Sequence, residues 1–162
     1  MKRIYLIFLT LAFSGCSTNI DFTSGSRVSG DTPRQNAVEE HTWSTMVGKW
    51  YGKQPRHDGG THEWLTTRYE DGTYEIVFRS TDPYGTVERT VETGLWGVSG
   101  NVYYTIFEGW IRGGRFVSTD LEGQYTRDAY KIISLTESEM KYRSIENGAI
   151  FKIRRVPEIF EL

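Results

Sequence analysis

The sequence predicts an all-β domain in which eight antiparallel strands form an up-and-down barrel behind a short N-terminal helix. Extended runs alternate with turn residues roughly every 8–12 residues, the spacing of sequential hairpins. Asp71-Gly72 and Asn147-Gly148 stand between two pairs of these runs, and such dipeptides are strong hairpin signals. Eight strands joined in this way close into a barrel, which leaves no exposed edge. A chain of 162 residues with 38% hydrophobic content is long enough for one such domain and its core.

The helix is predicted from about Ala37 to Val47. Asn36 and Glu39 have the spacing of a capping box, in which each side chain bonds a free backbone N–H of the first turn. Gly48 is a plausible end for this helix. Helical periodicity then disappears from the sequence.

The eight predicted strands follow in order. They span Gly48–Gln54, His62–Tyr69, Thr73–Thr81, Thr86–Val98, Val102–Phe107, Tyr130–Leu135, Glu139–Ile145 and Ala149–Val156. Apolar and polar residues alternate in several of them, which indicates one buried face. Arg155 lies two residues after Ile153 and four after Phe151, so its side chain should be on the same face of the strand as theirs and point inward. An inward arginine at a barrel end needs a partner, and an aromatic ring is a favoured one.

The N-terminus has the layout of a secretory signal peptide. Lys2 and Arg3 precede an apolar run that is too short to cross a hydrocarbon core of about 30 Å. We therefore expect a signal peptide over residues 1–15, a flexible tether over 16–35, rich in small polar residues, and the barrel domain over 36–162.

Phe13-Ser14-Gly15-Cys16 resembles the lipobox of bacterial lipoproteins. The resemblance implies that Cys16 becomes the acylated first residue of the mature chain, anchored in a membrane. Ser17 is similar to the residues that route such lipoproteins to the outer membrane, which gives a lipid-anchored domain facing the periplasm. An ordinary signal peptide whose cleavage site adjoins a cysteine is the alternative. Cys16 is the only cysteine, so no internal disulfide can form.

Gly48-Lys49-Trp50, behind a short helix and opening the first strand, resembles the Gly-x-Trp signature of the lipocalin and calycin superfamily. The resemblance implies a lipocalin-like barrel in which Gly48 and Trp50 lie at the closed end. It also implies that a basic residue of the last strand, Arg155 or Arg154, packs over Trp50. The middle Thr-Asp-Tyr motif of that family and its helix before the last strand have no match in this sequence.

The preferred functional hypothesis is binding of a small apolar or amphipathic molecule inside the barrel. Trp64, Trp96 and Tyr104 are the candidate ligand-binding residues, because ligand cavities are rich in aromatic side chains with a few polar groups. The alternative is that an eight-stranded barrel simply fills itself with its own side chains.

A protein-binding role is the second hypothesis, in which the barrel is a scaffold for an inhibitor or immunity-type lipoprotein. The segment Glu108–Arg127 is long for a hairpin connection, and such segments are often functional. Trp110 and Phe116 within it are the expected contacts for a partner or parts of a lid. A purely structural role in the envelope is a third possibility.

Other classes of function have little support. The net charge of −2 argues against binding nucleic acid, and the sequence lacks the common catalytic motifs, so we expect neither an enzyme nor a cofactor. No metal site is expected, because the spacing in the loop that holds His57, Asp58 and His62 fits no standard pattern. Two further groups are expected to be solvated and outward-facing. They are the arginines Arg68, Arg79 and Arg89 and the carboxylates Glu88 and Glu92.

Overall fold

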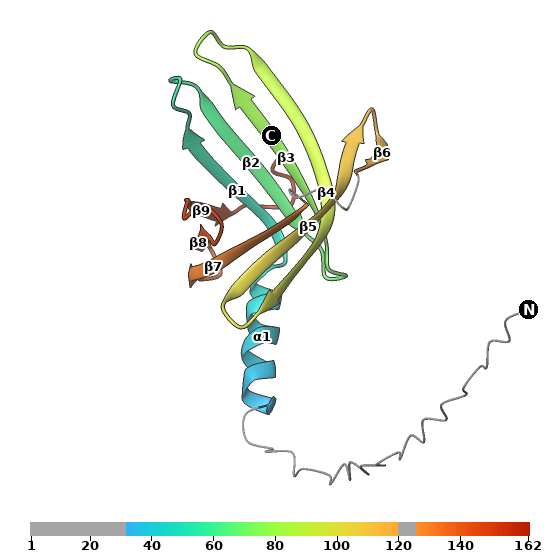
Figure 1. Ribbon diagram of the computed structural model, residues 1–162, viewed down its shortest axis with the longest axis vertical. Coiled ribbons are helices and arrows are strands. Elements are labelled where there is room, and N and C mark those ends of the chain that lie inside the picture. The colour runs from blue at the N-terminus through green and yellow to red at the C-terminus, as the bar shows by residue number, and fades with distance from the viewer. Residues whose placement is uncertain (1–31, 120–125) are drawn as a thin grey trace, which may run out of the picture. The chain divides into compact units, whose positions relative to one another are not determined.

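The computed structural model describes residues 32–119 and 126–162, and this part of the chain is an all-β domain with one helix (Figure 1). The helix α1 spans Thr32–Met46. The strands are β1 (Gly48–Pro55), β2 (Thr61–Arg68), β3 (Thr73–Thr81), β4 (Val87–Ser99), β5 (Val102–Arg112), β6 (Arg115–Ser118), β7 (Arg127–Leu135), β8 (Glu139–Ser144) and β9 (Ile150–Arg155). Cys16, Ser17, the predicted signal peptide and most of the predicted tether lie outside the described residues.

Eight of these strands close into an antiparallel barrel. The order is β4-β3-β2-β1-β9-β8-β7-β5, and an additional pairing of β4 with β5 joins the two ends. Neighbouring strands are sequential hairpins except where β1 meets β9 and β5 meets β7. The predicted fold, an eight-stranded up-and-down barrel behind a short helix, is therefore confirmed.

The start of the helix differs from the prediction. α1 begins at Thr32, so Asn36 and Glu39 lie inside the helix and not at its N-terminus, where a capping box was predicted. Glu39 instead reaches the barrel, where its Oε1 accepts a hydrogen bond from the backbone N–H of Gly100, 2.7 Å away. The acid that suggested a helix terminus thus ties the helix to the turn between β4 and β5.

The segment Glu108–Arg127 is partly strand. β5 continues to Arg112, and a turn through Gly113 and Gly114, both with positive φ, leads into β6. Among the described strands β6 pairs only with β5, so this hairpin extends from the barrel (Figure 1). Residues 120–125 of the segment lie outside the described residues.

Two apolar clusters hold the domain together. The larger one fills part of the barrel and includes Met46 of α1, Trp50 and Met140, each with no exposed surface. The smaller one lies on the outer face of the barrel, where Phe160 and Leu162 of the C-terminal segment pack against Leu65 and Val77. The C-terminal residues therefore cover an outer patch of β2 and β3, which the sequence analysis did not predict.

Candidate functional site: the barrel interior and an adjoining cleft

Trp50 lies at the end of the barrel that α1 covers. Its side chain has no exposed surface, and its Nε1–H donates to the carbonyl of Met46 at 2.9 Å. The guanidinium carbon of Arg155 lies 4.5 Å from the centre of the indole ring. Gly48 has φ +101°, and a Cβ there would lie 2.8 Å from Nη1 of Arg155. The positive φ favours glycine, and a Cβ at this position would displace the Arg155 guanidinium.

Arg155 closes this end by bonding three backbone carbonyls. Its Nε donates to Glu137 at 2.6 Å, its Nη1 to Val47 at 2.8 Å, and its Nη2 to Thr45. The carbonyls of Thr45 and Val47 belong to the end of α1 and the residue after it. Arg154 faces the other way, with its guanidinium 5.1 Å from the Tyr51 ring on the outer surface. Of the two arginines considered for contact with Trp50, the structure brings Arg155 to it.

Aromatic side chains form a continuous series of contacts along the inner wall. The centres of neighbouring rings in this series lie at most 6.0 Å apart. The series runs from Phe78 through His62 and Trp64 to Phe151. Phe151 contacts both Tyr142 and Tyr130, and each of these two contacts Tyr103. Gly52 makes one of these contacts possible. A Cβ on Gly52 would lie 2.2 Å from the Trp64 ring, so the absence of a side chain on β1 lets rings of β2 and β9 meet across it.

The inner wall changes from fully buried to half-buried along the barrel. Next to α1, Trp50, Met140 and Ile153 are at most 1% exposed. Farther along the same inner face, Ile76 and Phe78 are half-buried although they pack on the core. Part of the inner wall therefore remains accessible to solvent.

His62 belongs to this accessible part of the inner wall. It is half-buried, and its Nδ1 lies 2.8 Å from Oγ of Ser80. Burial and, to a smaller extent, the charge of Arg56 lower the pKa of His62. The neutral imidazole, which this environment favours, can both donate and accept a hydrogen bond.

The three candidate ligand-binding residues occupy different places. Trp64 is 4% exposed and lies on the inner wall. Trp96 is 3% exposed and belongs to the closed end, where it stacks on Trp43 of α1 at 4.1 Å and donates to the carbonyl of Tyr69. Tyr104 does not line the interior, contrary to expectation. It is 38% exposed and its ring covers Gly97 on the outer face, while the preceding residue, Tyr103, is the one that points inward.

Charged side chains on the inner wall were also expected to be solvated. Arg68 is in fact 2% exposed, because it has the parity of Trp64 and Thr66 on β2 and faces the interior with them. Glu92 pairs with Ile76 and is half-buried on the inner face of β4. Burial, and then the charge of Asp128, raise the pKa of Glu92. The interior thus contains one deeply buried cation and an acid whose ionisation is disfavoured.

The other arginines of that expected outward group do lie outside. Arg79 pairs with Glu63 at 2.7 Å on the outer face of β2 and β3. Glu63 is 5% exposed and also accepts a hydrogen bond from the Tyr51 hydroxyl at 2.6 Å. Burial alone would raise the pKa of Glu63, but the hydrogen bonds from Tyr51 and Arg79 lower it overall. Burial and that same bond raise the pKa of Tyr51 to about 12.

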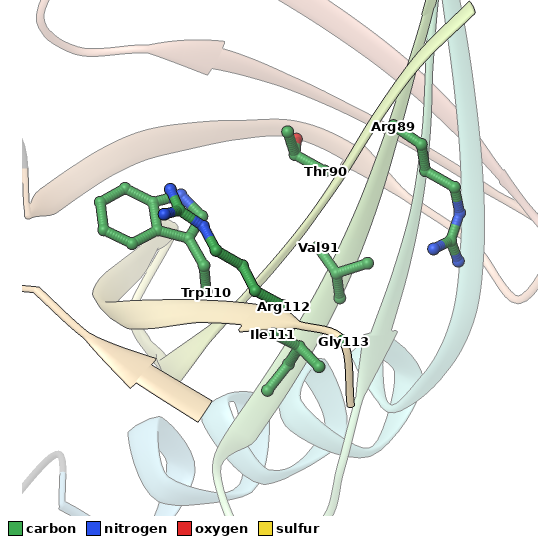
Figure 2. A pocket seen from close by; sticks show the side chains of 7 residues that line it. All are labelled: Arg89, Thr90, Val91, Trp110, Ile111, Arg112 and Gly113. Atoms are coloured by element: carbon green, nitrogen blue, oxygen red, sulfur yellow. The ribbon is translucent and has the colours of Figure 1, made fainter. Parts of the chain in front are cut away.

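A cleft of about 390 Å³ lies where β5 separates from β4 (Figure 2). Arg89, Thr90 and Val91 form one side, and Trp110–Gly113 form the other. The pairing of β4 with β5 stops at Glu92 and Trp110, so the N-terminal half of β4 pairs with β3 only among the described residues.

Trp110 and Phe116 differ in their surroundings. Trp110 is half-buried, with its ring 4.9 Å from that of Phe107 and the guanidinium of Arg112 over it. Phe116, on β6, is 56% exposed. Both therefore stand on the hairpin that leaves the barrel, but only Trp110 lines the cleft.

The described residues give no support to metal binding or to a membrane-spanning helix. Asp58 is bonded by Arg56 at 2.8 Å and by the N–H of Gly60, while His62 faces the interior. No group of three His, Cys, Asp or Glu residues in the described part is placed to hold a metal ion. In the same residues, no helix has the length and apolar character to cross a bilayer.

Among known proteins, similarity to this chain is found with solved structures. No protein-family model and no curated protein matches the sequence. Among solved structures, the chain is similar to the crystal structure of a lipocalin-like protein from Bacteroides uniformis, with 13% identity and a TM-score of 0.42. That match covers 69% of this chain and 99% of the other. The closed eight-stranded antiparallel barrel of this chain is the fold that the resemblance of Gly48-Lys49-Trp50 implied.

Proposed function

We propose that this protein is an outer-membrane lipoprotein, facing the periplasm, whose barrel binds a small apolar or amphipathic molecule. The observation that carries the ligand-binding part is the half-buried stretch of the inner wall, where Phe78 and Phe151 keep accessible surface beside a fully packed closed end. A barrel of eight strands has room for one small ligand at most. Barrels of this kind usually serve binding rather than catalysis.

The chemistry of that wall suits a partly apolar guest. Phenyl and indole rings provide apolar contact area, and polar groups at a few points fix the orientation of a ligand. His62 with Ser80, and the hydroxyl of Tyr130, are polar groups of this kind among the rings. A flat or chain-like molecule with one polar end matches this distribution best.

Binding can be tested with the neutral dye N-phenyl-1-naphthylamine, whose fluorescence rises in apolar surroundings. We expect saturable enhancement with the purified full chain, measured against protein-free buffer of the same composition, together with a rise in melting temperature with dye concentration. Phe78→Ser should weaken binding, because it removes a ring from the accessible inner wall. Tyr104→Ser is the matched control, since it removes an aromatic ring from the outer face.

Equal binding by the Phe78 and Tyr104 variants would place the dye outside the barrel. Absence of saturable binding by the wild-type protein would contradict the proposed function. Far-UV circular dichroism of each variant shows whether its fold is retained.

The anchor is tested separately through Cys16. Acylation of this residue would supply the chains that hold a domain stably at a bilayer. We expect Cys16→Ser to release the protein from the membrane fraction or to leave the signal peptide uncleaved, and to abolish metabolic labelling with fatty acid. Unchanged fractionation and labelling would contradict the lipoprotein assignment.

A protein partner is the second candidate function, and the cleft in Figure 2 is the observation that favours it. The half of β4 that pairs on one side only among the described residues has the backbone groups by which an extended segment can be added to a sheet. Trp110 would contact such a segment, and the exposed Phe116 lies on the same hairpin. A pull-down that succeeds with the wild type and fails with Trp110→Ser and Phe116→Ser together, in a folded variant, would support this role.

A further inference from the structure

A positively charged side chain lies inside the barrel with donors that no group in the described part of the chain accepts. Arg68 is the last residue of β2 and is 2% exposed. Its Nε and Nη1 are buried, and neither has a hydrogen-bond partner within the described residues. A guanidinium keeps its charge in proteins. Burying a hydrogen-bond donor without an acceptor lowers the stability of the folded state, and the loss is larger for a charged group.

The surroundings of Arg68 are aromatic. Its guanidinium carbon lies 4.6 Å from the centre of the Tyr103 ring and 5.9 Å from that of Trp96. Ring faces attract a cation, but they leave its N–H groups without oxygen acceptors. The charge of Arg68 also acts on the Tyr142 hydroxyl. Burial raises the pKa of this hydroxyl, and the charge of Arg68 lowers it by a smaller amount.

No carboxylate neutralises Arg68 in the described part of the chain. The four ion pairs found there involve other residues. Glu92, which is half-buried, and Asp128, which is largely exposed, are two acids of the inner face, and partial desolvation is the main cause that raises the pKa of each. Neither carboxylate forms an ion pair with Arg68 among the described residues. The inner cation and the inner acids are therefore separate features.

We propose that Arg68 binds the carboxylate of an amphipathic monoanion whose apolar part lies against the rings of the inner wall. This inference rests on the ligand-binding function proposed above. A carboxylate accepts hydrogen bonds from several guanidinium nitrogens at once, and such charge-assisted bonds are strong. One anion balances one cation. A dianionic phosphate would add an uncompensated charge to an inner face that already carries Glu92 and Asp128.

Binding must include a rearrangement of side chains. Arg68, Trp64 and Tyr103 are each at most 4% exposed, so a carboxylate reaches the guanidinium only when these rings make room. Trp64 and Trp96 lie on the inner wall and at the closed end respectively, and their fluorescence should report the change.

The test compares acids with the uncharged amides of the same shape. Octanoate is paired with octanamide, and 2-naphthoate with 2-naphthamide, and affinities for the purified full chain are measured by calorimetry and tryptophan quenching. We expect the carboxylate to bind about tenfold or more tightly than its amide, the difference typical of a charge-assisted hydrogen bond.

Two variants test whether Arg68 causes this preference. Arg68→Met, which keeps the approximate length and removes the donors, should abolish this preference and still bind N-phenyl-1-naphthylamine. Arg68→Lys, with its charge on a single ammonium, should retain only part of the preference.

The outcomes separate the proposed role of Arg68 from the general ligand-binding function. Equal affinity for acid and amide in the wild type, or a preference that survives in Arg68→Met, would overturn the role of Arg68 and leave ligand binding in place. Failure of all four compounds and of the neutral dye to bind would overturn both. If Arg68→Met does not fold, as seen by circular dichroism, Arg68→Lys decides, because an undiminished preference in that variant contradicts the proposal.

Discussion

Arg155 and Arg68 both meet an aromatic ring, but their remaining contacts differ. Arg155 lies 4.5 Å from the ring centre of Trp50, and Arg68 lies 4.6 Å from that of Tyr103. All three nitrogens of Arg155 donate to backbone carbonyls. Arg68 is almost completely buried, and two of its nitrogens have no acceptor in the residues that the structure describes.

The difference shows that a cation–π contact alone does not define the role of a buried arginine. Arg155 satisfies carbonyls near the end of α1, which otherwise lack an intrahelical partner. It is half-buried, so it also loses less hydration than Arg68. Arg155 therefore joins the helix to the barrel, whereas the free donors of Arg68 are suited to an acceptor from outside the chain.

The largest expected effect comes from breaking the closed end. Trp50→Ala removes a fully buried indole on which α1 and Arg155 both pack, and we expect the free energy of unfolding to fall by about 3–5 kcal/mol. Urea denaturation measures this. Trp110→Ala, at a half-buried ring in the adjoining cleft, should cost clearly less. Equal denaturation midpoints for Trp50→Ala and wild type would show that Trp50 does not stabilise the closed end.

The fold was predictable because turn chemistry and alternation act locally. The predicted strand boundaries agree with most of the barrel, since glycine-containing turns mark them in the sequence. The extension of β5 to Arg112 and the short β6 were less visible, because the Gly113-Gly114 turn lies in a segment where apolar and basic residues mix. The sequence predicts the wrong N-terminus for the helix, because the spacing of Asn36 and Glu39 is that of a capping box. Glu39 instead bonds the backbone of Gly100, 61 residues away, and no local pattern indicates this contact.

The candidate site was predictable only in part. Alternation along β2 places Arg68 on the same face as Trp64, which is the inner one. The usual preference of arginine for solvent favours the outer face instead, so the sequence alone does not predict a buried Arg68. Tyr103 and Tyr104 are equal candidates in the sequence, and which of them faces inward depends on pairing with β4, where Gly97 accommodates the ring of Tyr104. The cluster of Tyr51, Glu63 and Arg79 could not be foreseen, because it needs the register of three strands.

A matched substitution at the two arginines sharpens the comparison. Arg155→Met leaves three carbonyls without their donor, and we expect a loss of about 2–3 kcal/mol in unfolding free energy, similar to one or two charge-assisted hydrogen bonds. Arg68→Met removes a buried charge whose Nε and Nη1 have no acceptor among the described residues, so stability should be unchanged or increased.

The same denaturation experiment tests the link between Arg155 and Trp50. The effects of Arg155→Met and Trp50→Ala should be less than additive, because the two side chains share one contact. Equal losses for Arg155→Met and Arg68→Met would contradict the distinction between the two arginines.

The smallest expected effect concerns the acid on the same inner wall. Burial, and then the charge of Asp128, raise the pKa of Glu92, so its ionised form is disfavoured in the folded state. Stability from this group is present below the unfolded pKa of about 4.3 and is lost as the pH rises through the folded pKa. Glu92→Gln stays neutral, so it should be slightly more stable than wild type at pH 7, and this advantage should disappear near pH 4. Urea midpoints at the two pH values measure the change. Glu88→Gln, at an exposed position four residues earlier on β4, is the control, and an equal pH response of both variants would show that burial of Glu92 has no energetic consequence.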